Sequence, residues 1–338
     1  MKYSLIIPVY NRPDEADELL ESLTHQEEAP EFEVIIVEDG STRPCREVVA
    51  KYEDCLTIHY YAKPNSGPGP SRNYGAERAN GDWLIILDSD CVLPPGYLKA
   101  VETGIDGTFE AFGGPDAAHE SFTDIQKAIS YSMTSFFTTG GIRGGKKKMD
   151  RFHPRSYNMG IRRDVYSELS GFSTMRFGED IDFSYRILEA GHQTRLLPEA
   201  WVWHKRRTDL DKFFKQVFNS GIARIHLEKR HPGTMKPVHA LPAVFTIGVI
   251  SLLLAAVALR LFTATTLWIW ALMPLALFIL LIFTDSSIRC RSAVIGFLSV
   301  EAAFVQLFGY GLGFIKAWWQ RYIMHSGEFT AYEKNFYE

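Results

Sequence analysis

The sequence predicts an α/β domain followed by transmembrane α-helices. Residues 1–90 alternate apolar runs of strand length with amphipathic segments of helix length, which is typical of a mostly parallel sheet covered by helices on both faces. After residue 238, three long apolar runs follow one another. Each can cross a hydrocarbon core of about 30 Å, because an α-helix rises about 1.5 Å per residue.

Length and composition permit one large domain with an appendage. The chain has 338 residues, 46% of them hydrophobic, so a sizeable core can form and a disordered or fibrous protein is excluded. Its four cysteines form no C-x-x-C pair and no zinc-type spacing, which favours reduced thiols over a disulfide framework. The apolar run at residues 3–9 is too short for a signal peptide, so we expect the first domain to stay in the cytoplasm.

The elements of the first domain follow from its apolar periodicity. We expect strands at residues 3–7, 33–37, 56–61 and 83–87, and helices at residues 14–25 and 71–79. Ligands of such sheets bind beyond the carboxyl ends of the strands. Asn11 follows the first strand, Asp39 the second, and Asp88 and Asp90 the fourth. The sequence therefore predicts a polar site at this edge of the sheet.

The membrane part consists of the three apolar runs. They cover residues 240–259, 261–284 and 292–315, and Glu301 is their single charged residue. The alternative is a hydrophobic helical domain inside a soluble protein, but three such runs in succession rarely belong to a soluble core. We therefore expect three transmembrane helices.

Basic residues set the expected orientation. Residues 204–236 carry nine Lys or Arg against three acids, and Arg289 and Arg291 lie between the second and third runs, whereas Arg260 alone lies between the first and second. The positive-inside rule then predicts a multi-pass inner-membrane protein with a cytoplasmic N-terminal domain. Three spans would place the tail on the opposite side, although the tail itself carries basic residues.

The triplet Asp88-Ser89-Asp90 ends an apolar strand and precedes a Pro-Pro-Gly turn. Carboxylates at a sheet edge can bind a hard divalent cation that also holds a diphosphate, and the metal would neutralise charge on a leaving nucleotide. A D-x-D sequence alone is weak evidence, since surface and capping aspartates are common. Its position at a strand end favours the metal hypothesis.

A Gly/Pro-rich loop at residues 65–70 leads into a helix with Arg72 near its start. Backbone N–H groups of this loop and the Arg72 side chain could contact a diphosphate. An ordinary turn followed by an N-cap serine explains the segment equally well. Both interpretations stay open from the local sequence.

Glu179 and Asp180 follow Gly178 at the start of an apolar-periodic helix. Acids are common there because they suit the positive end of the helix dipole. The functional hypothesis is that one carboxylate projects into an acceptor site and removes a hydroxyl proton as a general base.

Three further features have a functional and an ordinary interpretation. Asp116, after a Gly-Gly-Pro turn, could contact a sugar or simply belong to the turn. His204 could supply a metal nitrogen or a phosphate contact, although an isolated histidine is more often structural. The basic stretch at residues 143–151 predicts a solvated loop, or one that gathers anionic lipid or a lipid-linked phosphate at about 1 kcal/mol per basic residue.

Six short motifs, taken in order, resemble the family 2 glycosyltransferases of the GT-A fold over about residues 1–207. They are Ile7-Pro8-Val9-Tyr10-Asn11, Val37-Glu38-Asp39-Gly40-Ser41, Arg72-Asn73-Tyr74-Gly75, Asp88-Ser89-Asp90, Ser156-Tyr157-Asn158-Met159-Gly160 and Gly178-Glu179-Asp180. Each motif is short, but their order makes the resemblance specific. It implies a Rossmann-like nucleotide-diphospho-sugar transferase domain, an inverting single displacement and a divalent metal, Mg²⁺ or Mn²⁺.

The resemblance also assigns a donor site. Tyr10 and Asp39 would hold the nucleobase and ribose, with Pro8 and Asn11 in the same nucleotide-sugar site, and Arg72 would lie near the diphosphate. The donor would be a UDP- or GDP-linked sugar. No nucleic-acid partner is expected.

Metal and acceptor residues follow from the same matching. Asp88 and Asp90 would serve the nucleotide sugar and its metal, Asp90 as the direct ligand, and His204 would be an additional metal or phosphate ligand. Asp180 would be the catalytic base. The expected acceptor-site residues are Glu179, Asp116 and Asn158.

The expected organisation is a catalytic domain at residues 1–207, a basic juxtamembrane segment at 208–239, three transmembrane helices within 240–315 and a tail at 316–338. A lipid-linked or membrane-proximal glycan acceptor of cell-envelope polysaccharide or glycolipid synthesis suits this layout, with membrane lipids as further partners.

Two alternatives are weighed against this function. A processive polysaccharide synthase is disfavoured, because no Q-x-x-R-W motif follows the Glu-Asp pair and three spans are few for a channel. An inactive sugar-binding membrane scaffold is disfavoured because Asp88, Asp90 and Asp180 are all present.

Overall fold

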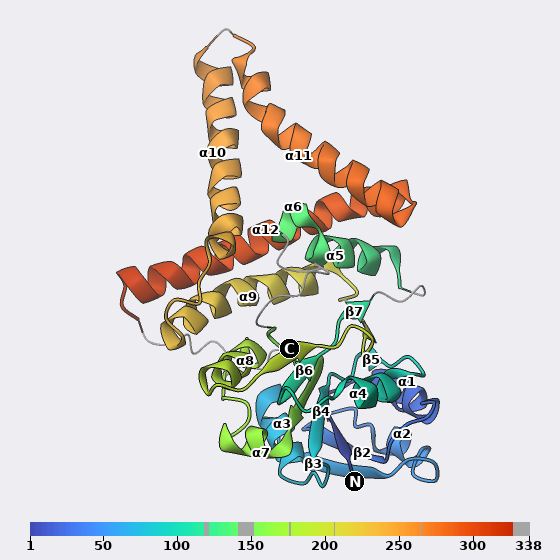
Figure 1. Ribbon diagram of the computed structural model, residues 1–338. Helices are drawn as coiled ribbons and strands as arrows, with labels where there is room; N and C mark the ends of the chain where they lie inside the picture. The colour runs from blue at the N-terminus through green and yellow to red at the C-terminus, as the bar shows by residue number, and fades with distance from the viewer. Residues whose placement is uncertain (118–121, 141–151, 176, 206, 264, 327–338) are drawn as a thin grey trace. The chain divides into compact units, whose positions relative to one another are not determined.

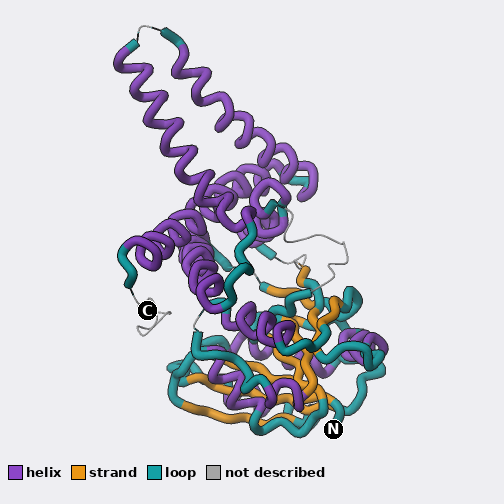
Figure 2. The backbone as a smooth tube through the Cα atoms, turned by 60° about the vertical axis from the view of Figure 1, so that its left-hand side comes forward, coloured by secondary structure: helices purple, strands orange, loops and turns teal. Residues whose placement is uncertain are grey.

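The computed structural model describes residues 1–117, 122–140, 152–175, 177–205, 207–263 and 265–326. The chain forms two compact units (Figures 1 and 2). The first comprises residues 1–119 and 147–205, and the second residues 120–146 and 206–338. The basic stretch at residues 143–151 lies outside the described residues, as does the end of the tail after residue 326.

The first unit is built on a mixed sheet in the order β3-β2-β1-β4-β8-β6-β9. Its strands are β1 (Tyr3–Val9), β2 (Phe32–Asp39), β3 (Ile58–Lys63), β4 (Trp83–Leu87), β6 (Ala111–Gly113), β8 (Asn158–Arg162) and β9 (Thr194–Leu196). All neighbouring pairs are parallel except those of β8, which runs antiparallel to β4 and β6. The predicted α/β class with a mostly parallel sheet is therefore confirmed.

Helices cover both faces of this sheet. They are α1 (Pro13–Thr24), α2 (Arg46–Ala50), α3 (Pro68–Ala76), α4 (Tyr97–Gly104), α7 (Arg163–Glu168) and α8 (Glu179–Glu189). Because successive strand residues point to opposite faces, Leu5 and Ile7 of β1 pack with α1 and α4, while Ile6 packs with α3, α7 and α8. A small second sheet has the strand order β5 (Cys91–Val92), β10 (Val202–His204) and β7 (Asp116–Ala117). Two of its strands follow strands of the large sheet in the chain, β5 after β4 and β7 after β6.

The expected elements lie close to their predicted places. Strand β3 is shifted by two residues toward the C-terminus relative to the predicted range 56–61. Helix α3 starts at Pro68 rather than Ser71, because proline is suited to the first helical turn and Gly67, with φ of 93°, supplies the cap conformation. Ser71 is therefore not an N-cap; its hydroxyl donates to the Gly67 carbonyl one turn earlier.

The second unit is helical. It contains α5 (Asp124–Thr134), α6 (Phe136–Thr139), α9 (Leu210–Arg230), a 3₁₀ turn (Pro237–Ala240), α10 (Leu241–Phe262), α11 (Leu267–Cys290), α12 (Ala293–Trp318) and a π-helical turn (Trp319–Ile323). Helices α10, α11 and α12 are long and apolar enough to cross a membrane. Helix α5 belongs to this unit, although its sequence lies inside the expected catalytic domain, because its apolar face packs on α12.

Candidate active site

The loops after β1 and β2 are tied together by Asn11. This residue adopts a left-handed conformation with φ of 55°. Its backbone N–H donates to Ser41 Oγ at 2.7 Å, and its Oδ1 accepts from the backbone N–H groups of Thr42 and Arg43 at 2.8 and 2.9 Å. Pro8 lies earlier in the chain, on β1, where it is paired with Val37 of β2 in the parallel register. Asn11 thus shapes the loop that bears Tyr10.

Asp39 fastens the end of β2 to the Gly/Pro-rich loop. Its carboxylate accepts from the backbone N–H groups of Ser66 and Gly67, both at 2.9 Å, and pairs with Lys63. Two of the backbone N–H groups that were expected to contact a diphosphate therefore donate to Asp39 instead. The assignment of Tyr10 and Asp39 to nucleobase and ribose stays a prediction.

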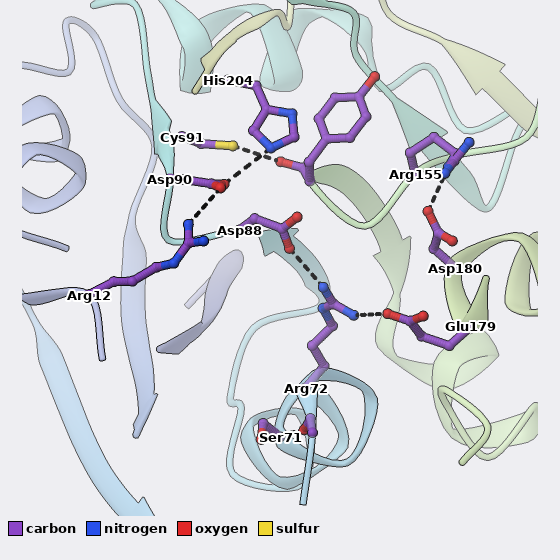
Figure 3. A network of polar contacts seen from close by, with 12 residues as sticks. Arg12, Ser71, Arg72, Asp88, Asp90, Cys91, Arg155, Glu179, Asp180 and His204 are labelled. Carbon is purple, nitrogen blue, oxygen red and sulfur yellow. Dashed lines mark hydrogen bonds and ion pairs between the residues drawn. The ribbon is translucent and has the colours of Figure 1, made fainter. Parts of the chain in front are cut away.

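Arg72 joins two acidic segments that are distant in sequence (Figure 3). Its guanidinium donates to Asp88 Oδ1 at 2.7 Å and to Glu179 Oε1 at 2.9 Å. It also lies over the Phe172 ring, 5.1 Å from the centroid. The Arg72 side chain is buried, so these charge-assisted bonds fix the end of β4 against the start of α8.

Asp90, Cys91 and His204 form a cluster of potential metal ligands (Figure 3). His204 of β10 lies directly opposite Cys91 of β5 in the antiparallel register. One ligand atom from each of the three residues lies within 4.8 Å of the others. Asp90 Oδ1 is 3.1 Å from His204 Nε2, and Asp90 Oδ2 accepts from Arg12 Nη1 at 2.9 Å.

The donor chemistry of this cluster fits a divalent cation. A carboxylate oxygen suits Mg²⁺ and Mn²⁺, and an imidazole nitrogen adds a ligand that Mn²⁺ accepts more readily than Mg²⁺. The Tyr157 ring stacks on His204 at 4.9 Å and orients it. Asp88, the other predicted metal residue, is engaged by Arg72 instead of lying in the cluster. The structure therefore brings Asp90 and His204 together as the sequence predicts.

Glu179 and Asp180 open helix α8. The cap residue Gly178 has φ of 75°, a conformation that glycine adopts without a Cβ penalty. Both carboxylates are almost fully buried. Asp180 Oδ2 accepts from Arg155 Nε at 2.6 Å, and Oδ1 accepts from the Ile181 backbone N–H at 2.9 Å. Since a carboxylate has about four acceptor positions, Asp180 retains capacity for a further proton donor.

The two acids have opposite electrostatic environments. Burial raises the pKa of Glu179 above its ordinary value; the Arg72 charge opposes this rise and the Asp180 charge adds to it. Burial would also raise the pKa of Asp180, but the charge and hydrogen bond of Arg155 outweigh it and hold that pKa below its ordinary value. Asp180 is therefore the ionised member of the pair at neutral pH.

The remaining predicted acceptor residues differ in their placement. Asp116 lies on β7, where its Oδ1 is 3.3 Å from the Tyr157 hydroxyl. Asn158 is completely buried on β8; its Oδ1 accepts from the Tyr97 hydroxyl at 2.7 Å and its amide donates to the Ala200 carbonyl at 2.8 Å. Asn158 therefore supports the frame of the site, because both ends of its side-chain amide are engaged within the protein.

Four residues of the site were not predicted from the sequence: Arg12, Cys91, Arg155 and Tyr157. Cys91 had an available signal, since it directly follows the D-x-D triplet. Tyr157 stands in the motif at residues 156–160 and Arg155 directly precedes that motif, but no spacing rule connects them to Asp180 or His204. Only the fold brings these pairs together.

A Rossmann-like sheet whose strand ends carry this acidic site defines the GT-A class of glycosyltransferases. A family model described as glycosyl transferase family 2 matches residues 4–170, and the chain belongs to this family.

Curated relatives agree with the family. An uncharacterized glycosyltransferase of Haemophilus influenzae is 31% identical over 194 residues, which cover 55% of this chain and 62% of the relative. The pre-mycofactocin glycosyltransferase of Mycobacterium tuberculosis is 27% identical over 258 residues, or 70% of this chain and 49% of the relative. The chain thus spans less than two thirds of either relative's length.

A solved structure has the same fold. The mannosyltransferase PcManGT from Pyrobaculum calidifontis, in complex with GDP-Man and Mn²⁺, aligns with a TM-score of 0.58 at 16% sequence identity. The alignment covers 95% of this chain and 88% of that one.

Proposed function

We propose that this protein is an inverting, metal-dependent glycosyltransferase that transfers a sugar from a UDP- or GDP-linked donor to a membrane-proximal, lipid-linked glycan acceptor of the cell envelope. The observation that carries the proposal is the pairing of acids through one arginine. Arg72 connects Asp88, beside the metal-ligand cluster, with Glu179, beside the ionised Asp180. In this arrangement, the residues that would bind the nucleotide sugar and its metal lie next to Asp180, the residue that would act as general base.

On the donor side, Asp90 and His204 would hold the divalent cation, with Asp88 directing the nucleotide sugar. The cation would stabilise the negative charge of the departing diphosphate. The Mn²⁺ and GDP-Man in the related fold of PcManGT support this assignment. Arg12, which bonds the second oxygen of Asp90, keeps the carboxylate oriented.

On the acceptor side, Asp180 would act as general base. The acceptor hydroxyl oxygen attacks the anomeric carbon, its proton passes to the Asp180 carboxylate, and the bond to the diphosphate oxygen breaks so that nucleoside diphosphate leaves. Attack and departure on opposite faces invert the anomeric configuration. Glu179, fixed by Arg72, would line the acceptor pocket together with Asp116.

The membrane context supports a lipid-linked acceptor. The catalytic unit continues directly into basic helix α9 and then into the apolar helices. An enzyme tethered in this way meets lipid-linked substrates at high effective concentration. The same layout supports an inner-membrane location with a cytoplasmic catalytic unit.

The function is tested with the full chain purified in detergent micelles. UDP- and GDP-sugars are screened for metal-dependent hydrolysis and thermal stabilisation, followed by polyprenyl-phosphate-linked glycans as acceptors. Asp180→Asn should lower kcat by about 10²–10⁴-fold, the usual contribution of a general base, while nucleotide binding stays nearly unchanged. Unchanged turnover in this variant refutes the base assignment.

Asp182→Asn provides the matched control. Asp182 lies in the same helical turn and is also buried, but it accepts from Arg186 at 3.0 Å and is not among the potential metal ligands of the described residues. We expect this variant to melt at a lower temperature and to retain turnover. If no nucleotide sugar stabilises the wild-type protein, the inactive-scaffold alternative gains support instead.

A further inference from the structure

The three apolar helices of the second unit are not arranged as three parallel spans. In both views α10 and α11 rise as a hairpin, while α12 crosses the base of that hairpin (Figures 1 and 2). The contacts of the described residues agree with this arrangement. A helix that spans a bilayer beside two others would contact them along its length, so the restricted contacts of α12 need an explanation.

Helix α12 meets α10 at the first turns of α10. Thr246 Oγ1 lies 3.4 Å from the Leu307 carbonyl. A Cβ placed on Gly311 would lie only 2.5 Å from the Pro242 carbonyl oxygen, so the two backbones touch there. The Phe245 ring packs on Phe304 at 5.9 Å.

Helix α12 meets α11 in the C-terminal half of α11, from Phe278 onward, which lies at the same end of the hairpin. Ser286 Oγ donates to Ser299 Oγ at 2.6 Å, and the Phe283 ring lies 4.6 Å from that of Phe297. Both sets of contacts therefore place α12 at the hairpin base rather than alongside its arms.

A charged helix covers another side of α12. Gly221 of α9 approaches the Tyr310 carbonyl so closely that a Cβ would lie 2.2 Å from it, and Gly313 of α12 approaches the Phe218 carbonyl in the same way, at 2.0 Å. Helix α9 carries seven acidic or basic side chains besides a histidine: Asp211, Lys212, Lys215, Arg224, Glu228, Lys229 and Arg230. Moving only two of them to a bilayer centre costs about 5 to 7 kcal/mol.

The remaining half of α12 contacts another polar helix. Ile295 and Ala302 pack with Ala128 and Ile129 of α5. Nearby, the Tyr131 hydroxyl of α5 donates to Asp285 of α11 at 2.7 Å. Because α9 and α5 together follow most of α12 and are themselves unsuited to hydrocarbon, α12 must lie at the same depth as they do.

The exposed face of α12 is suited to an interface. Val294, Phe297 and Leu312 are exposed on it, and the exposed Glu301 lies among them. The exposed Trp318 and Trp319 follow at its end. Tryptophan favours the headgroup level, and an in-plane helix keeps one carboxylate in water while its apolar side chains contact acyl chains.

We propose that only α10 and α11 cross the bilayer and that α12 lies in the plane of the interface, in contact with lipid headgroups. The chain at Ser326 would then return to the side of the catalytic unit. This inference replaces the expected third span and goes beyond the proposed transferase function. It also accounts for the basic residues of the tail, which three spans would place on the side that the positive-inside rule disfavours.

The first test maps sidedness with a membrane-impermeant maleimide on inverted vesicles and on intact spheroplasts. The exposed Cys55 reports the catalytic unit. In a Cys55→Ser/Cys290→Ser background, Ser326→Cys reports the tail and Thr265→Cys the hairpin tip. We expect Ser326→Cys to react from the same side as Cys55, and Thr265→Cys from the other. Reaction of Ser326→Cys from the side of Thr265→Cys would overturn the proposal.

The second test measures depth with spin labels at Val294→Cys and Leu312→Cys on α12, using collision with oxygen and with a water-soluble nickel complex. These positions should have nearly equal depth in an in-plane helix, whereas in a straight spanning helix they differ by about 27 Å. Val244→Cys and Leu261→Cys on α10 are the matched control and should differ by about 25 Å. A graded depth along α12 would contradict the proposal without affecting the transferase assignment.

Discussion

At the residue scale, the site depends on arginines that hold its acids in place, and one of them, Arg155, keeps the buried Asp180 ionised. Arg72 serves Asp88 and Glu179, and Arg155 serves Asp180. A buried carboxylate without such a partner takes up a proton, because ionisation in a poorly solvated environment is costly. The partner arginines therefore determine over which pH range the proposed base can accept a proton.

Arg155→Gln should move the acidic limb of the kcat/KM profile to higher pH. Asp180 is ionised in the wild-type protein down to low pH because Arg155 lowers its pKa, and base function is lost only as pH falls through that lowered value. Without Arg155 the effect of burial remains, so the pKa rises and protonation begins at higher pH. We also expect turnover at neutral pH to fall about tenfold, equal to roughly 1.4 kcal/mol.

The pH profile of sugar transfer distinguishes this role from a purely structural one. Arg155→Lys keeps the charge and should keep the limb near its wild-type position. Arg162→Gln removes an exposed arginine of β8 that pairs with Asp164, and it should leave both limb and turnover unchanged. An unshifted limb in Arg155→Gln would show that Arg155 does not control Asp180.

Asp90→Asn should weaken Mn²⁺ binding at least tenfold, because the amide lacks the charge that a hard cation requires. Titration calorimetry with Mn²⁺ and nucleoside diphosphate measures this without relying on turnover. Asp164→Asn, an exposed aspartate outside the cluster, is the charge-matched control. Equal Mn²⁺ affinity in wild type and Asp90→Asn would remove Asp90 from the metal site.

Much of the site could be predicted at this scale, but its partners could not. Asp90 and Asp180 stand in short motifs that are read directly from the chain. The contacts Arg12 to Asp90 and Arg155 to Asp180 join residues 78 and 25 positions apart, and local sequence contains no signal for such pairs. Asn158 shows the converse, since its motif was recognised but its amide is consumed by the protein frame.

At the element scale, helix packing in the second unit depends on glycines at backbone contacts. The length of the uncharged apolar runs identified the long helices correctly, because runs of this length have few other interpretations. It could not distinguish a spanning helix from one that lies across two others, since both are apolar. The difference lies in small residues that face charged helix α9, notably Gly313.

Gly221→Ala should destabilise the full chain by about 1 to 3 kcal/mol, because the added methyl group meets the Tyr310 backbone rather than a movable side chain. Thermal unfolding in detergent measures the effect. Gly248→Ala on α10 is the control: nothing lies within 4 Å of its added Cβ, and alanine favours a helix, so its stability should be equal or higher. A loss in Gly248→Ala as large as in Gly221→Ala would mean that the α9–α12 contact is not decisive.

At the scale of the whole molecule, chain order and structural units do not coincide. Residues 120–146 interrupt the catalytic sequence yet belong to the helical unit. Composition could not reveal this, because α5 is an ordinary amphipathic helix whose apolar face would fit either unit. Only the packing shows which unit α5 joins, because Ile129 and Met133 belong to the same apolar cluster as Ile295 and Ala302 of α12.

The helical unit also bears on product length. A synthase that threads a polymer through the membrane needs a ring of helices around a channel, and most side chains of α10 and α11 in the described chain are exposed rather than packed around a lumen. We therefore expect one sugar per acceptor. With donor in large excess, mass spectrometry should find a single mass increment on a polyprenyl-phosphate-linked glycan, at early and late times alike. A ladder of products that lengthens with time would instead favour the processive alternative, with the channel formed by several copies.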